Sequence, residues 1–152
     1  MIYARRPKIE SRINEVFKHA SGVTDLWFQS EVAKYLCILM SGLLEEWCRD
    51  LVQSYSHKRA QPQIVIYITS RMDSFYNPNL EKILQLIRSF APNIAENLEE
   101  TIEPRLKDAV DSISNNRKQL AHGKDVGLTL NRAKDYFVRT KTLIEFIESK
   151  FK

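Results

Sequence analysis

The sequence contains only two cysteines, Cys37 and Cys48, which excludes a scaffold held together by several disulfides. They fall on one predicted helix, about 16 Å apart along its axis, which is too far for them to bridge each other. The sequence also lacks a cluster of cysteines and histidines at the spacing of a zinc site. We therefore expect both cysteines to be small buried apolar residues, and we expect no metal and no other cofactor.

Glycine and proline are also scarce, with four and five residues, which leaves little room for a disordered segment. No apolar run approaches the roughly 18–20 residues that span a membrane, and no hydrophobic stretch of signal-peptide length follows the first arginines. These absences predict a single domain over residues 1–152, located in the cytoplasm, with no membrane partner. The net charge of +4 is compatible with a nucleic-acid partner but does not by itself indicate one.

Apolar residues recur at helical spacing along most of the chain. The segment Ile64 to Thr69 has strand composition, but Val65, Ile68 and Met72 repeat at helical spacing and a lone strand would have no partner, so we predict helix there. The pattern predicts an all-α fold, a single-domain bundle of five to seven helices around one long central helix. The other expected helices run over about 7–20, 24–55, 80–90, 92–101, 104–122 and 129–150, with caps at Thr24, Asn79 and Thr129.

The helix that begins at Pro104 has an arginine in its apolar stripe. Continuing the spacing of the stripe places its missing member at Arg117. A buried, unpaired guanidinium would cost several kcal/mol, so we expect Arg117 to reach an acidic partner or a protein–protein interface. The alternative is a purely structural arginine, which extends from the edge of the stripe into solvent or pairs with an acidic residue on the long helix. The stripe itself consists of Leu106, Val110, Ile113 and Leu120.

His122 stands just before Gly123, where this helix is expected to end. The partial negative charge of a helix C-terminus favours a protonated imidazole there. In a regular helix Arg117 and His122 would point roughly 140° apart, so they would act together only if the helix end unwinds or across a twofold axis between two chains. A histidine that merely caps the helix is the alternative.

The combination Asn-Asn-Arg-x4-His-Gly resembles the signature of the HEPN superfamily, an Arg-x4–6-His motif near a helix end in an α-helical bundle. The run from Leu43 to Trp47, the Asn-Pro-Asn turn at 77–79 and the Thr-capped last helix are similar to the RiboL-PSP type of HEPN domain. This resemblance spans about residues 10–150. It implies a metal-independent endoribonuclease that acts as a homodimer with the motif at the interface. It assigns catalytic roles to Arg117 and His122 and a weaker flanking role to Asn116.

Metal-free cleavage of RNA uses the 2′-OH as the nucleophile and needs a base, an acid and positive charge on the phosphorane. One motif supplies one histidine and one guanidinium, whereas a symmetric pair supplies two of each, so the chemistry itself favours a dimer. Arg117 suits the phosphate because its fork can make two parallel hydrogen bonds. Basic side chains nearby would extend the track for the RNA backbone, or would simply be solvated surface charges. They are Lys118, Lys124 and Arg132.

An acidic residue is expected to orient His122 or to hold Arg117 while RNA is absent. Glu45, in the family-like part of the long helix, is the first candidate, and Asp111 is the second. Tyrosines at 67, 76 and 136 could stack on bases, although aromatic residues at helical spacing more often belong to a core.

The sequence leaves three functional hypotheses. The first is a ribonuclease, acting as a toxin or a defence effector, with an antitoxin or another partner protein. The second is a non-catalytic HEPN module that dimerises and binds RNA, nucleotide or a protein. Lys118 keeps the second open, because the family commonly has a small polar residue directly after the arginine. The third is a helical adaptor unrelated to nucleic acid.

Overall fold

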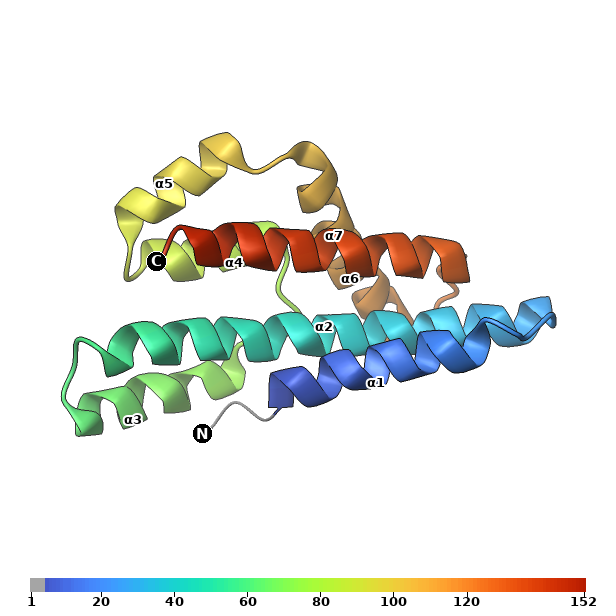
Figure 1. The fold of residues 1–152 in the computed structure, drawn as a ribbon, viewed down its shortest axis with the longest axis horizontal. Helices are drawn as coiled ribbons and strands as arrows, with labels where there is room; N and C mark the ends of the chain where they lie inside the picture. The colour runs from blue at the N-terminus through green and yellow to red at the C-terminus, as the bar shows by residue number, and fades with distance from the viewer. Residues whose placement is uncertain (1–4) are drawn as a thin grey trace.

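The computed structural model describes residues 5–152, and within them it contains seven α-helices, one 3-10 turn and no strand (Figure 1). This confirms the predicted all-α bundle. Residues 1–4 of the predicted domain lie outside the described part. The elements are α1 (Arg5–Ala20), α2 (Leu26–His57), α3 (Pro62–Arg71), η1 (Met72–Ser74), α4 (Leu80–Arg88), α5 (Pro92–Thr101), α6 (Pro104–Ala121) and α7 (Leu130–Ser149).

Helix α2 is the central element of the bundle, as its length predicted. It contacts α1 and α3 on one side and α6 and α7 on the other, and α1 and α7 run alongside it in Figure 1. Its inward residues, including Leu36, Met40, Leu43 and Trp47, are fully buried. Burying one such side chain contributes about 1.5–3 kcal/mol, so α2 supplies a large part of the core. None of the helices in residues 5–152 has the length and hydropathy that crossing a membrane requires.

Local sequence signals set most of the helix ends. Prolines occupy the first positions of α3, α5 and α6, and the side chains of Asn79 and Thr129 accept hydrogen bonds from the first turns of α4 and α7. The expected cap at Thr24 is wrong by one residue, because the carboxylate of Asp25 accepts the N–H of Phe28 instead. Phe28 itself is an exposed side chain of the first turn.

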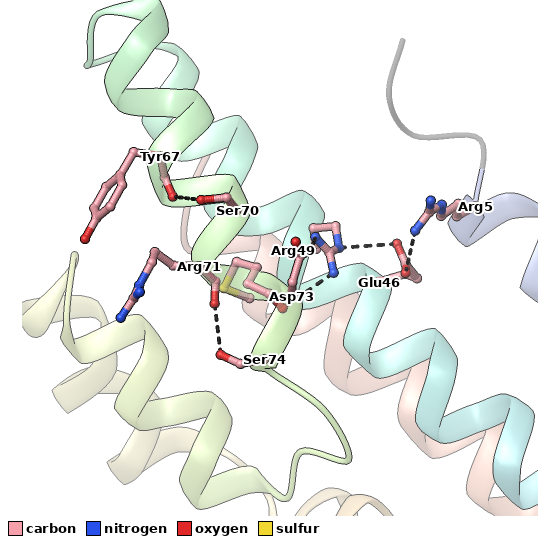
Figure 2. A network of polar contacts seen from close by, with 9 residues as sticks. Arg5, Glu46, Arg49, Tyr67, Ser70, Arg71, Asp73 and Ser74 are labelled. Atoms are coloured by element: carbon pink, nitrogen blue, oxygen red, sulfur yellow. Dashed lines mark hydrogen bonds and ion pairs between the residues drawn. The ribbon is translucent and has the colours of Figure 1, made fainter.

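The segment from Ile64 to Thr69, which has strand composition, is helical, as predicted. Helix α3 packs Val65 against α2 and leaves Ile66 and Tyr67 exposed, so its apolar residues occupy both faces. The turn η1 that follows is held to α2 by an ion pair of 2.8 Å between Arg49 Nη1 and Asp73 Oδ1 (Figure 2). One face of α3 therefore joins the bundle while the other meets solvent.

Both cysteines are buried on α2, which confirms their expected role as apolar core residues. Burial raises the pKa of the Cys37 thiol to about 11, against the opposing charge of Arg117. Burial likewise raises the pKa of Cys48. Since a thiolate is the reactive form of cysteine, neither residue is suited to be a nucleophile at neutral pH.

Charged residues gather where α1 and α7 meet α2. Arg6 Nη1 contacts Glu148 Oε1 at 2.7 Å, and the same oxygen accepts a hydrogen bond of 3.2 Å from the indole of buried Trp47. Asp50 lies beside them on α2. Its burial raises the pKa of its carboxyl from 3.8 to about 6, with Arg6 opposing the shift and the carboxylates of Glu46 and Glu148 adding to it.

An Asp50→Asn variant is expected to be more stable than the wild-type protein at pH 7.5 and to lose this advantage at pH 4. A carboxyl whose pKa is raised by folding contributes stability below its unfolded pKa and loses it as the pH rises through the folded value, here about 6. Because the side chain is only partly buried, we expect a gain of about 1 kcal/mol. Urea unfolding at both pH values measures it, with exposed Glu145→Gln as the control. An equal free energy of unfolding at pH 7.5 would contradict the assignment.

Candidate functional site

Helix α6 ends at Ala121, and His122 is the first residue outside it. The amide of Gly123 donates to Leu120 O and the amide of Lys124 donates to Gln119 O, each at 3.0 Å. These two hydrogen bonds form a helix-ending motif that requires a left-handed backbone at Gly123. Gly123 has this conformation, with φ +71°. His122 itself has φ −95° and ψ 13°. The amide of His122 donates to Gln119 O at 3.1 Å, so α6 ends in a tightened turn at the histidine and not in the unwound end that we expected a site within one chain to require.

Arg117 has an acidic partner, as its place in the apolar stripe predicted. Its Nη1 lies 3.4 Å from Oε1 of Glu45 on α2, and the Arg117 side chain is 31% exposed. The same Glu45 oxygen accepts the backbone N–H of Asn77 at 2.6 Å. A carboxylate held by a backbone amide is a fixed counter-charge, so it sets the position of the guanidinium while leaving part of it open to solvent.

The loop that crosses in front of Glu45 is fixed at Asn77. This residue is left-handed, with φ +47°, a conformation that asparagine tolerates better than most residues. Its side chain accepts from Ser41 Oγ at 3.1 Å and donates to Ser114 O at 3.0 Å, and its carbonyl accepts from Ser114 Oγ at 3.1 Å. The loop is thereby tied to both α2 and α6, which holds its neighbour Tyr76 beside Arg117.

A surface cavity of about 710 Å³ opens at this point. Arg117 and His122 both line it, so one chain brings the two motif residues to a common space. Among residues 5–152, those that line the cavity include three basic side chains and no carboxylate, and Glu45 pairs with Arg117, so the charge of the cavity favours an anion. The cavity is lined by residues from four segments of the chain. They include Ile38, Tyr76, Lys82, Arg117, Lys118 and His122.

The remaining predicted site residues lie elsewhere. Asp111 does not pair with the motif: its carboxylate accepts the N–H of Leu80 at 2.9 Å and contacts Lys107 at 2.6 Å, so it anchors the start of α4. Arg132 lines a different hollow of about 810 Å³ between α6 and α7, among three aspartates. Asn116 is half-buried on α6 and Lys124 is exposed beyond the helix end. None of these four lines the cavity of Arg117 and His122.

Sequence reasoning missed two residues of the cavity. Lys82 on α4 reaches back to the loop, where its Nζ donates to Tyr76 O at 2.9 Å. Ile38 lies on α2, outside the stripe that marks its buried face, and is 46% exposed. Nothing local distinguishes either residue, because a solvated lysine and an apolar residue off the stripe are both common in surface helices. Lys82 and Ile38 reach the cavity only because the fold brings segments far apart in the sequence into contact.

Exposed apolar side chains continue from the cavity along α2. Ile38 and Trp27 are separated by three helical turns and therefore lie on the same side of the helix. Tyr35 is exposed one turn from Ile38, and Leu26 and Phe28 flank Trp27. We call these five residues the α2 apolar patch. The ion pair of Lys34 with Glu31 lies between Trp27 and Ile38 on the same side of α2, so the patch has an apolar part at each end. Large exposed apolar side chains gathered on one helix are candidates for an interaction surface.

A family model described as RiboL-PSP-HEPN matches residues 7–152. No curated protein and no solved structure matches the chain. The matched range includes Glu45, Asn77, Arg117 and His122, so it contains every residue of the ion pair and the motif described above.

Proposed function

Because the chain belongs to the RiboL-PSP-HEPN family of the HEPN superfamily, we propose that it is a metal-independent endoribonuclease whose active site is completed by a second copy. The observation that carries this proposal is the cavity lined by both Arg117 and His122, in which Glu45 holds the arginine. This supports the proposal because the imidazole and the guanidinium line one cavity whose charge favours an anion.

The reaction that these groups suit is attack by the ribose 2′-OH on the adjacent phosphorus. His122 of one copy takes the proton from the 2′ oxygen as the bond from this oxygen to phosphorus forms. The bond from phosphorus to the 5′ oxygen then breaks, and the second copy's histidine donates a proton to that oxygen. The products are a 2′,3′-cyclic phosphate and a free 5′-OH. No water enters this step, and DNA is spared because it has no 2′-OH.

In this proposal Arg117 stabilises the charge of the phosphorane. Its guanidinium is positioned by Glu45 before RNA arrives, so little reorganisation is needed when charge develops on the phosphoryl oxygens. Lys82 and Lys118 lie on the same cavity and would bind the phosphates on either side of the cleaved bond. Electrostatic attraction of this kind steers RNA to the cavity and weakens as salt concentration rises.

The second copy is proposed to dock on the α2 apolar patch. Ile38 belongs both to this patch and to the cavity lining, so a twofold axis near it would bring the two cavities together. The chemistry gives an independent reason for two copies, because one chain offers a single histidine at the cavity while the reaction needs a base and an acid. An enzyme of this kind would damage its own cell unless restrained, which fits a toxin or defence effector with a partner protein.

Wild-type protein incubated with a structured RNA in EDTA is expected to cleave it and to leave 2′,3′-cyclic phosphate ends. The same RNA with 2′-O-methyl groups is expected to stay intact, because its nucleophile is blocked. Mass spectrometry of the fragments identifies the ends. Binding of the RNA with no cleavage would instead support the non-catalytic HEPN module, for which the lysine at 118 is the relevant departure from the family. A protein that neither binds nor cleaves the RNA would contradict both the ribonuclease and the RNA-binding module.

A further inference from the structure

We propose that Tyr76 is a nucleobase-stacking residue, on which the base next to the cleaved phosphate packs. This inference rests on the proposed function and specifies how the same cavity would hold its substrate. Tyr76 follows α3 and η1 in the loop before α4, and its side chain is 63% exposed. It lines the cavity together with Arg117 and His122.

The position of the ring is fixed although the ring itself is open to solvent. The next residue, Asn77, is tied to α2 and α6 by the hydrogen bonds to Glu45, Ser41 and Ser114. Lys82 holds the carbonyl of Tyr76. An exposed aromatic side chain on a backbone held this firmly can bind a flat ligand at little cost in conformational entropy, since only its own two torsions must be fixed.

Two cations lie over the ring of Tyr76. The Nζ of Lys82 lies 5.0 Å from its centroid, and the guanidinium carbon of Arg117 lies 5.9 Å from it. A nucleotide presents a flat base with a phosphate on each side, which matches an aromatic ring that has two positive groups over it. A free phosphate would use only the cations, and an aliphatic ligand would use only the ring. The arrangement therefore fits a nucleotide of an RNA chain better than either.

The short separation between Tyr76 and Arg117 determines which nucleotide of the strand would stack on the ring. Because the guanidinium carbon of Arg117, the proposed phosphate ligand, lies over the Tyr76 ring at 5.9 Å from its centroid, the base packed on Tyr76 belongs to a nucleotide adjoining the phosphate that Arg117 binds. A stacking residue tolerates any base, since every base has a flat face. Tyr76 would thus raise affinity and fix the register of the strand while leaving base identity largely unread.

The test compares two uncleavable ligands of equal charge. One is a 2′-O-methyl oligoadenylate, and the other is a 2′-O-methyl ribose-phosphate chain of the same length without bases. Fluorescence anisotropy is expected to show that wild-type protein and Tyr76→Phe bind the oligoadenylate more tightly than the abasic chain. Tyr76→Ala is expected to lose about 5- to 150-fold of this preference while its affinity for the abasic chain is unchanged.

Tyr67→Ala is the matched control, because Tyr67 is 61% exposed, lies beside Arg71 on α3 and does not line the cavity (Figure 2). Retention of the base preference in Tyr76→Ala, or no preference in the wild-type protein, overturns the stacking. A Tyr76→Ala protein that becomes monomeric by light scattering, while the wild type is dimeric, also overturns it, since the ring would then contact the second copy. This test can be distinguished from the test of the proposed function, because the proposed function is measured by cleavage of unmodified RNA.

Discussion

A His122→Ala variant is expected to cleave RNA about 10²–10⁴-fold more slowly than the wild-type protein. General acid–base catalysis by a positioned side chain contributes a factor of this size, and in a twofold-symmetric site the substitution removes both the base and the acid. His122 is exposed and lies outside the regular part of α6, so its loss should leave the fold intact. Initial rates on a fluorophore-labelled RNA in EDTA measure the effect.

His57→Ala is the control for this variant, since His57 is also exposed and is the last residue of another helix, α2. It should retain full activity. Circular dichroism and the melting temperature should agree among the three proteins. A His122→Ala protein that cleaves RNA at the wild-type rate would contradict the proposed role. Activity lost equally in both variants would point to a trace contaminant or to damage of the fold.

An Ile38→Arg variant is expected to be monomeric and to lose most of the RNA cleavage. In the proposed dimer each Ile38 lies near the twofold axis, so one substitution places two arginines in an apolar interface. An unpaired buried charge costs about 3–5 kcal/mol, which weakens the dimer more than about 100-fold. Because Ile38 is 46% exposed in a single chain, its replacement should cost the monomer little stability. Light scattering and the cleavage rate at several protein concentrations measure both effects.

Val138→Arg is the matched control for the interface. Val138 is 56% exposed on α7 and does not line the cavity, so an arginine there should change neither the mass in solution nor the cleavage rate. High protein concentration should partly restore cleavage by Ile38→Arg, because a weakened dimer reforms by mass action. A monomeric wild-type protein that cleaves RNA, or a dimeric Ile38→Arg, would contradict the shared site.

The helices could be predicted closely because their signals are local. Prolines at the first turns, the side chains of Asn79 and Thr129 that accept the N–H groups of Lys82 and Arg132, and the left-handed Gly123 act on backbone groups within a few residues. The segment around Val65 has strand composition, so its helix could be predicted from the helical spacing of its apolar residues and from the absence of a partner for a lone strand. The cap of α2 was placed one residue early because Thr24 and Asp25 are both good caps, and local chemistry does not choose between neighbours.

The sequence by itself determined that Arg117 needed a partner, because an arginine in an apolar stripe cannot be left buried and unpaired. It also determined where α6 ends, and hence that His122 stands at the C-cap of this helix. The packing of α2 against α6 decided which carboxylate pairs with Arg117. It brings Glu45 to the arginine, while Asp111 accepts a hydrogen bond from the start of α4. The same packing brings Tyr76, Lys82 and Ile38 to the motif. Contacts between distant segments depend on how helices cross, and helical periodicity specifies which face of a helix is buried without specifying what it meets.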